Sequence, residues 1–413
     1  MRTWFSLDTW GIVAATCAAI ALLYVIPQNF SFLSPFTQAL GDFDLTDMVF
    51  TQFRDDDAVA ADTSIVLVNI GDCDRADIAV MIDRIRSQQP RAIGVDAFFR
   101  QPKEEDRAGD SLLADVCSST RNLVLVSKVA YRNEESYDID QAFDTLETSH
   151  PMFMRGVSTG YANLIIDQDA AFMTVRTVSL TEECDGRQEP SFALRIAEIA
   201  NPSAAGLARS RGTSEEVINY RGGVEKFYAL DVEDVRDSAV DLSILHDKIV
   251  LMGYMGDRLG QPSFTDNFFT PLNSAYVGRS YPDMYGVVIH ANVVSMILSG
   301  RYITTMPLWQ SLLLGFVVLW FNVGLFTWIF RHAENWYDTL ALGLQLGQSL
   351  LFLYLTIVMY DVATYKLVFT PALVAVALVG TVHDLYHDSI KKLVKAMINR
   401  IRRTPTTFNA EST

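Results

Sequence analysis

The sequence predicts an α/β extracytoplasmic domain with a mixed, partly parallel sheet, together with four transmembrane α-helices. Half of the 413 residues are hydrophobic (50%) and the mean hydropathy is +0.17, which is too apolar for an ordinary soluble protein. A charged fraction of 20% is too high for a chain that lies wholly in a membrane. The apolar residues cluster in four segments, and short β-branched runs alternate with helical ones between the first two, as in strands joined by crossover helices.

Acidic residues dominate the long polar segment of the chain. The formal net charge is −16, and residues 28–330 contain 42 Asp and Glu against 24 Lys and Arg. Because contacts with phosphates require a basic surface, this composition excludes a nucleic acid as the partner of this segment.

Four apolar runs predict the membrane helices: residues 11–26, 307–330, 337–360 and 367–383. About 20 apolar residues cross a hydrocarbon core. The second and third runs reach this length, whereas the first and last reach it only with aromatic residues at the interfaces. A cleaved signal peptide is the alternative for the first run, although no small-residue cleavage site follows Ile26.

Cationic loops predict the orientation of these helices. Residues 386–413 contain six Lys and Arg against two acidic residues, so we expect them in the cytoplasm, together with the N-terminus. The predicted organisation is an N-terminal anchor (1–30), an extracytoplasmic domain (31–305), a three-helix transmembrane bundle (306–386) and a basic amphipathic cytoplasmic tail (387–413).

Strand-like and helix-like runs alternate through the predicted domain. Its front half predicts strands at 64–71, 92–99 and 122–129 and helices at 76–89 and near 108–118. Its rear half predicts antiparallel strands at 161–167 and 173–180, a helix at 191–200 capped by Ser191, strands at 215–222 and 248–254, and a helix at 286–300 ended by Gly300.

Several ordered motifs closely resemble the CHASE type-two sensory domain, an extracytoplasmic sensor associated with bacterial cyclases and histidine kinases. The motifs are FDLTDMVF (43–50), IVLVNIG (65–71), PRAIGVDAFF (90–99), DSLL from Asp110, INYRG (218–222), HDKIVLMG (246–253), TDNFFTP (265–271) and YGVVIHANVVSMILSG (285–300). The resemblance covers roughly residues 31–300 and implies a sensor in the bacterial inner membrane. Residues 71–79 lack the Trp- and Pro-rich stretch of many members, so no ligand contact is carried over there.

Candidate ligand residues follow the predicted parallel strands, because open α/β sheets bind ligands at the carboxyl ends of their strands. Such a set suits a small cationic or polar ligand, or a divalent cation. In the alternative interpretation, Asp96 orders a buried loop and the others are solvated. The set comprises Asp72, Asp74, Arg75, Asp96, Lys128, Tyr254 and Asp257.

Asp266 and His290 form a second candidate pair, since a carboxylate next to an imidazole suits acid–base or metal chemistry. The alternative is structural: Asp266 caps its loop, Pro271 fixes the turn, and His290 forms a buried hydrogen bond. We recognise no catalytic constellation around them, so we expect no enzymatic activity, no cofactor and no bound metal.

The four cysteines, Cys17, Cys73, Cys117 and Cys184, include no C-x-x-C pair. Three of them belong to the predicted domain, where an oxidising compartment allows one disulfide and one remaining thiol. That disulfide has two alternatives: Cys73 pairs either with Cys117 or with Cys184.

Two features near the C-terminus suggest contacts beyond the domain. Gly343 and Gly347 form a G-x-x-x-G pattern, which either joins two copies in a homo-oligomer or packs the bundle internally. The amphipathic tail either lies on the membrane lipids or docks into a separate cytoplasmic protein. Its candidate contact residues are Lys391, Lys392, Lys395, Arg400, Arg402 and Arg403.

The sequence thus predicts a non-enzymatic sensor or transducer. Only 28 residues follow the last predicted span, fewer than a catalytic domain needs, so we expect the signal to pass to a separate effector protein. The alternative is a structural subunit or docking scaffold of a multi-protein envelope complex. A periplasmic enzyme is a third interpretation, which the absence of a recognised catalytic constellation disfavours.

Overall fold

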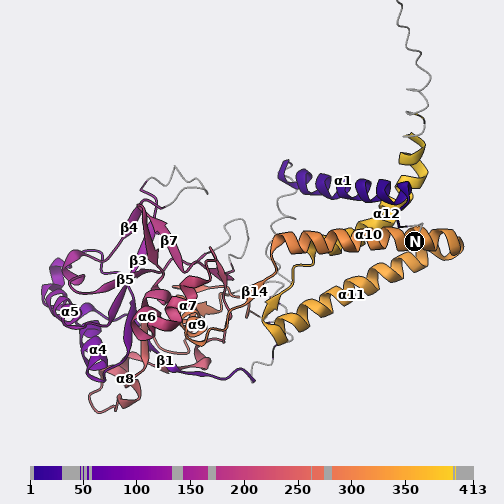
Figure 1. The fold of residues 1–413 in the computed structure, drawn as a ribbon. Coiled ribbons are helices and arrows are strands. Elements are labelled where there is room, and N and C mark those ends of the chain that lie inside the picture. The colour runs from indigo at the N-terminus through magenta and orange to yellow at the C-terminus, as the bar shows by residue number, and fades with distance from the viewer. Residues whose placement is uncertain are drawn as a thin grey trace, which may run out of the picture. The chain divides into compact units, whose positions relative to one another are not determined.

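The computed structural model describes residues 4–29, 47, 50, 54, 58–132, 143–165, 174–261, 263–273, 281–393 and 396. The chain divides into two compact units (Figure 1). The α/β unit comprises Gln38–Thr304, and the helical unit comprises Met1–Thr37 with Thr305–Thr413.

A mostly parallel sheet forms the centre of the α/β unit. Its strand order is β10-β1-β11-β2-β3-β4, and β5 also pairs with β3. All pairs are parallel except β3 with β4, so the predicted mixed, partly parallel sheet is confirmed. The strands are β1 (Asp62–Asn69), β2 (Ala92–Asp96), β3 (Leu123–Ala130), β4 (Thr145–Glu147), β5 (Ser158–Tyr161), β10 (Phe227–Leu230) and β11 (Ile249–Gly253).

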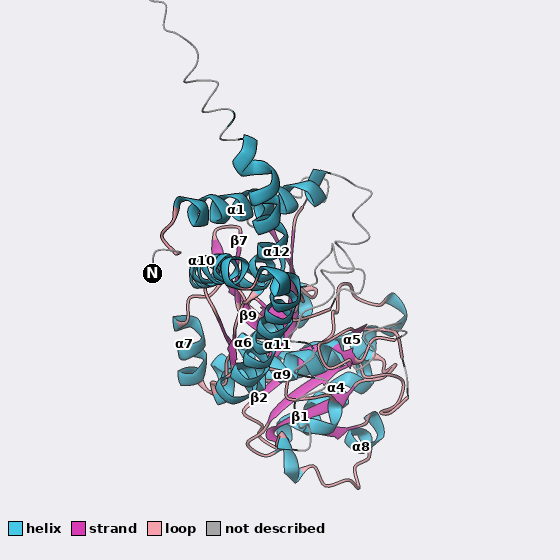
Figure 2. Cartoon of the chain, turned by 90° about the vertical axis from the view of Figure 1, so that its right-hand side faces the viewer, coloured by secondary structure: helices cyan, strands magenta, loops and turns pink. Residues whose placement is uncertain are grey.

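Helices cover both faces of this sheet (Figure 2). One layer contains α4 (Arg75–Ser87), α5 (Arg107–Ser119) and α8 (Val232–Arg236), and the other contains α6 (Phe192–Ala200), α7 (Pro202–Ser210) and α9 (Gly286–Ser299). Burial on both faces explains why the central strands are continuous apolar runs rather than alternating ones. In β1, for example, Ile65, Val66, Leu67 and Val68 are all buried.

The ends of these helices follow local sequence signals. The Asp74 carboxylate accepts the Asp77 N–H at 2.8 Å and begins α4, and the Ser191 hydroxyl accepts the Leu194 N–H at 3.3 Å and begins α6. At its other end α9 stops at Gly300, whose φ of +65° suits a residue without a Cβ. The predicted Ser191 cap and Gly300 stop are both confirmed.

Three short antiparallel pairs complete the α/β unit: β6 (Thr177–Val178) with β9 (Glu216–Val217), β7 (Thr181–Cys184) with β8 (Arg187–Pro190), and β12 (Asn267–Phe268) with β13 (Met284–Tyr285). The predicted antiparallel pairing of 161–167 with 173–180 is wrong in its described part. β5 ends at Tyr161 and extends the main sheet beside β3, while β6 pairs with β9. β5 and β6 each pair with a strand that is distant in the sequence, and they do not form a hairpin with each other.

The helical unit contains α1 (Leu7–Asn29), α10 (Leu308–His332), α11 (Tyr337–Ala363) and α12 (Thr370–Leu385), which continues as a π-helical turn at Tyr386–Ile390. α10 packs along α12, and α1 contacts both. Apolar side chains from these helices meet in one cluster that includes Ile12, Val323 and Val379. Two amides add polar contacts: Gln348 Nε2 donates to Asn322 Oδ1 at 2.9 Å, and Gln345 Nε2 donates to the Val376 carbonyl at 2.9 Å.

The prediction of four membrane-spanning helices is wrong. Within the described residues, two helical stretches are long and apolar enough to cross a membrane, Leu308–His332 and Glu334–Tyr360. α12 has 16 residues, which is a length of about 24 Å, short of a hydrocarbon core of roughly 30 Å. In α1, the apolar stretch is Leu7–Leu22, which is also too short.

All four cysteines are unbridged. Cys117 and Cys184 are buried and Cys73 is half-buried. Neither of the two disulfide alternatives for Cys73 is present.

Candidate functional site

The carboxyl ends of β2 and β11 lie side by side. Asp96, the last residue of β2, is aligned with Gly253, the last residue of β11. Successive side chains of a strand point to opposite faces, so Asp96 and Gly94 share a face. Gly94 lies against α6, since a Cβ there would come within 2.8 Å of Phe192 Cζ. The Asp96 carboxylate therefore lies on the face of the sheet that α6 and α9 cover.

The first turn of α9 packs directly against this edge. A Cβ on Gly253 would lie 2.6 Å from Val287 Cβ, so the glycine allows α9 to approach the end of β11. The chain reaches α9 through the β12–β13 ribbon, and the Gly286 N–H donates to the Asp266 carbonyl at 3.0 Å. Both carboxylate oxygens of Asp266 lie 3.1–3.2 Å from the position that a Cβ on Gly286 would occupy.

Two carboxylates without a counter-charge meet at this edge. Burial raises the pKa of Asp96 to about 6. Burial, and then the nearby Asp96 carboxylate, raise the pKa of Asp266 to about 7. Many protein atoms lie near the Asp266 carboxylate, and these raise its pKa. The residue is nevertheless exposed to solvent. Neither carboxylate accepts a hydrogen bond or forms an ion pair within the described part of the chain, so the alternatives in which they order or cap a loop are not supported.

His290 is the third polar side chain of this group. It follows Gly286 by one helical turn, which places both on the same face of α9, and helical side chains lean toward the helix N-terminus. His290 therefore lies one turn beyond the residue that packs against the Asp266 carboxylate. It is 4% exposed and contacts the Phe192 ring edge-on, with centroids 5.3 Å apart.

Burial lowers the pKa of His290 to about 4, so the ring is neutral near pH 7 and one of its nitrogens is a hydrogen-bond acceptor. Among the residues that the structure describes, no group forms a hydrogen bond with either nitrogen. Within these residues the predicted buried hydrogen bond of His290 is not found, and the ring packs edge-on against Phe192.

The candidates that follow β1 have structural roles. Asp72 is exposed in the loop, and Asp74 caps α4. Arg75 is buried, pairs with Asp110, and donates to the Gln101 carbonyl at 2.6 Å. The Arg75 guanidinium is thus fully engaged inside the unit and is not presented to a ligand.

Lys128 and Asp257 interact with residues other than Asp96 and Asp266. Lys128 is exposed on β3 opposite Glu147 of β4, and its charge helps Arg100 to lower the pKa of that carboxyl. Asp257 accepts the Tyr254 hydroxyl at 3.2 Å. Out of the predicted set, the structure therefore brings together Asp96 and Asp266, and His290 belongs to α9, which packs at the same edge.

Asn69, which the sequence analysis did not single out, organises the same edge at the neighbouring strand β1. Its amide donates to the Asp231 carboxylate and to the Gly256 carbonyl, both at 3.0 Å. Its amide oxygen accepts the N–H groups of Gly71 and Met255 at 3.0 and 2.9 Å. Asn69 thus ties together the loops that follow β1 and β11, and the Asn in IVLVNIG was the available sequence signal.

One serine motif is not a nucleophile site. Gly156-Val-Ser-Thr-Gly160 fits the pattern G-x-S-x-G, whose nucleophilic serine sits at a turn from a strand into a helix. Ser158 is instead the first residue of β5. Gly160 has a packing reason, since a Cβ there would lie 2.7 Å from Phe192 Cα.

No metal site emerges from the part of the chain that the structure describes: no three His, Cys, Asp or Glu side chains gather in a way that could hold an ion. The edge at Asp96 therefore presents two neighbouring carboxylates and no metal centre among the described residues.

In the helical unit, the predicted contact residues differ in their packing, ion pairing and exposure. No atom lies within 4 Å of a Cβ built on Gly343 or on Gly347, so neither glycine packs the bundle internally. Lys391 forms an ion pair with Asp8 at 2.6 Å, and Lys392 is exposed. The remaining tail candidates, Lys395, Arg400, Arg402 and Arg403, lie outside the described residues.

Comparison with known proteins gives one match. Residues 18–326, about three quarters of the chain, match the family described as CHASE2 domain. No curated protein and no solved structure matches the sequence.

Proposed function

The chain belongs to the CHASE2 domain family, an extracellular sensory family, and we propose that it is a non-enzymatic sensor in the bacterial inner membrane. In this proposal, the α/β unit lies outside the cytoplasm and binds a ligand. The signal passes through the membrane helices to a separate protein. The observation that carries the proposal is the group of unpartnered polar side chains at the carboxyl edge of the sheet of a sensory domain, where α/β sheets bind ligands.

The helical unit supports the membrane part of the proposal. Leu308–His332 and Glu334–Tyr360 have the length and composition of spanning helices. The ion pair between Asp8 and Lys391 holds the start of α1 beside the segment that follows α12. These two ends of the helical unit therefore lie together, as they do when both are on the same side of a membrane.

α9 is the element that we propose as the relay. It begins with Gly286 at the edge of the sheet, carries His290 one turn later, and ends at Gly300. α10 starts at Leu308, so only a short connection joins the two helices. A ligand that binds one position of α9 better than another shifts the population toward that position, and the chain transmits this shift to α10.

Reporter fusions test the topology. Gly212 is a suitable insertion point, because it lies in a loop and no atom lies within 4 Å of a Cβ built there. A reporter enzyme that is active only outside the cytoplasm should be active at Gly212. Inactivity at Gly212, together with activity there of a reporter that works only in the cytoplasm, would refute the proposed arrangement.

A photo-crosslinking residue at Lys392 tests the relay to a partner. The position is exposed and follows the π-helical turn. We expect a crosslink to a separate protein in native membranes. The same probe at exposed Trp309 of α10 should crosslink to lipid and serves as the matched control. If the probe at Lys392 captures lipid alone, the proposal of a docked effector fails.

A further inference from the structure

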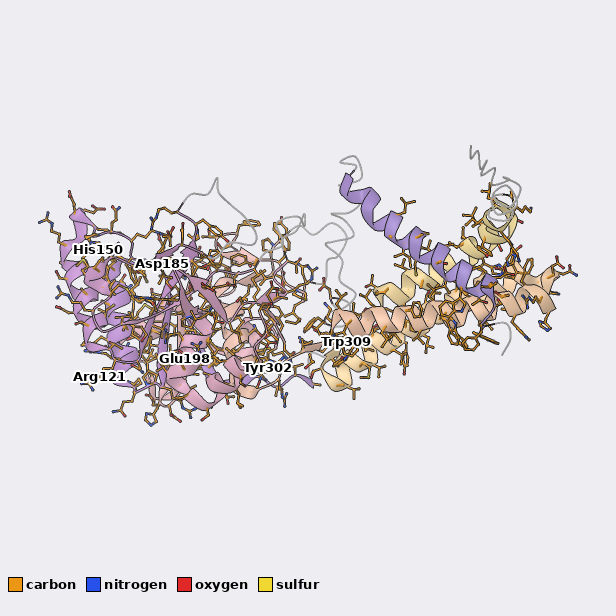
Figure 3. The ribbon with its side chains drawn as sticks, turned by 45° about the horizontal axis from the view of Figure 1, so that its top comes forward. Arg121, His150, Asp185, Glu198, Tyr302 and Trp309 are labelled. Carbon is orange, nitrogen blue, oxygen red and sulfur yellow. The ribbon has the colours of Figure 1, made fainter. Side chains whose placement is uncertain are left out.

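Two histidines of the helical unit lie against each other where α12 passes into the π-helical turn. His383 lies in the last turn of α12, and His387 is the second residue of Tyr386–Ile390. Their ring centroids are 4.8 Å apart, and both rings pack on Phe330 of α10, at 5.3 and 5.5 Å. Phe330 lies near the end of α10 opposite to Trp309, which Figure 3 labels. π-helical turns are rare and are frequent at functional sites.

Each of these histidines has a buried ring nitrogen without a hydrogen-bond partner among the described residues. His383 is 0% exposed, and its Nδ1 lies 3.0 Å from the Tyr337 hydroxyl and 3.4 Å from Asp384 Oδ1. The Nε2 atoms of His383 and His387 are both buried and unpartnered. A neutral imidazole can leave this nitrogen unprotonated, whereas a protonated imidazole has two N–H donors. Protonation would therefore create a buried donor, and a buried charge, that no acceptor satisfies.

The charged groups around the two rings do not remove this penalty. Asp8 of α1 and Asp384 favour a positive charge on the rings, whereas Arg331 of α10 and Lys391 oppose it. Tyr337 of α11 contributes its hydroxyl. Burial is the largest effect, and it lowers the pKa of both histidines below the ordinary 6.5. The folded helical unit therefore favours the neutral form of both rings.

The π-helical turn also holds the segment that follows α12 against α1. Tyr386 packs on Gly11, where any Cβ would collide with the tyrosine ring. Lys391 forms its ion pair with Asp8 at 2.6 Å. Opening of the turn would break both contacts and free the segment Tyr386–Leu393 from α1.

We propose that His383 and His387 form a proton switch, in which uptake of a proton by the pair opens the π-helical turn and releases the following segment from α1. In the open turn, water accepts the hydrogen bonds that the closed turn cannot. Because the open turn binds the proton more tightly, opening is favoured as the pH falls below about 6.5 and is suppressed above it. This switch goes beyond the proposed function, since it requires neither the α/β unit nor a ligand at the edge of the sheet.

The test is hydrogen–deuterium exchange of the full chain in detergent at pH 7.5 and pH 5.5, corrected for the pH dependence of intrinsic exchange. We expect the amides from Tyr386 to Leu393 to exchange at least about tenfold faster at pH 5.5. The reason is that an imidazole with the ordinary pKa of about 6.5 is about ten times more often protonated than neutral at that pH. The amides in the middle of α10 should keep their protection, which shows that the helical unit stays folded.

Histidine variants identify the groups that respond. His387→Phe keeps a ring that stacks on Phe330 and removes one titrating group, so it should reduce the pH response. The double variant His383→Phe/His387→Phe should abolish it. His332→Phe is the matched control, because His332 is exposed and stacks on Trp328 with centroids 5.0 Å apart. This control should respond as the wild type does.

Three results would overturn the inference: equal corrected exchange of Tyr386–Leu393 at both pH values in the wild type, a full response in His387→Phe, or loss of the response in His332→Phe. If α10 loses its protection in the double variant, His387→Phe alone decides. A response that His387→Phe reduces and His332→Phe retains assigns the switch to the buried pair.

Discussion

Burial and the neighbouring Asp96 carboxylate raise the pKa of Asp266 to about 7, although the two residues come from distant parts of the chain. Asp96 ends a strand of the main sheet, and Asp266 precedes the ribbon that leads into α9. Their meeting explains how a change at the sheet edge can reach the helix that precedes α10.

The contribution of Asp266 to the stability of the protein should fall as the pH rises from about 4 to about 7. The pKa of Asp266 is higher in the folded state than the ordinary 3.8, so the folded protein binds more protons in this window. Asp266→Asn should therefore raise the free energy of unfolding at pH 7.5 by about 1 kcal/mol, a value reduced because the exposed carboxylate is screened by solvent. Urea unfolding at pH 5 should show a smaller gain, and an equal gain at both pH values would contradict this interpretation.

The buried ion pair of Arg75 with Asp110 should contribute far more to the free energy of unfolding than an exposed pair does. Arg75→Ala leaves the Asp110 carboxylate buried and unpaired, and should lower the free energy of unfolding by about 3–5 kcal/mol. Arg91→Ala breaks the exposed pair with Asp247 and should cost less than about 1 kcal/mol. Equal losses in urea unfolding would show that burial does not set the importance of the pair.

Gly253 should be intolerant of any side chain. A Cβ there would lie 2.6 Å from Val287 Cβ, so Gly253→Ala should lower the free energy of unfolding by about 1–3 kcal/mol. Adding Val287→Ala makes room and should recover part of this loss, which a double-mutant cycle in urea measures. Additive losses would mean that the two residues do not press on each other.

The glycines of the helical unit should divide into two groups. Gly315→Leu should destabilise the bundle in detergent, because a Cβ there would lie 2.8 Å from Pro371 Cβ. Gly343→Leu should leave the thermal unfolding temperature unchanged, because no atom lies within 4 Å of that position. A marked loss for Gly343→Leu would show that the G-x-x-x-G face is packed in the detergent-solubilised protein.

The sequence was sufficient to predict the main elements of the α/β unit. Continuous apolar runs such as 64–71 predict strands buried on both faces, and Ser191 and Gly300 mark helix ends by chemistry that depends on adjacent residues. The antiparallel pair at 161–180 was predicted wrongly, because strand partners depend on contacts between distant segments. Membrane spans were overcounted because the hydropathy of α12 resembles that of α10 while its length does not.

The sequence was sufficient to name the residues at this edge as candidates, but not to predict that residues from two separate sets lie at the same edge. Asp96, Asp266 and His290 were all candidates, yet they stood in two separate sets, since nothing in the sequence brings a strand end to the start of a helix near residue 286. Arg75 stood among them because its partner, Asp110, is far away in the sequence. Periodicity reports which face a residue occupies and not which distant charge it meets.

Hydrogen–deuterium exchange of the full chain at pH 5 and at pH 7.5, corrected for the pH dependence of intrinsic exchange, tests most directly whether Asp96 and Asp266 couple the edge of the sheet to α9. The amides from Asn267 to His290 should be less protected at pH 7.5, where the Asp266 carboxyl is more fully ionised, and this difference should be smaller in Asp266→Asn. Equal protection at both pH values in the wild type, or the same difference in the variant, would contradict the assignment of the sensory edge to Asp96 and Asp266.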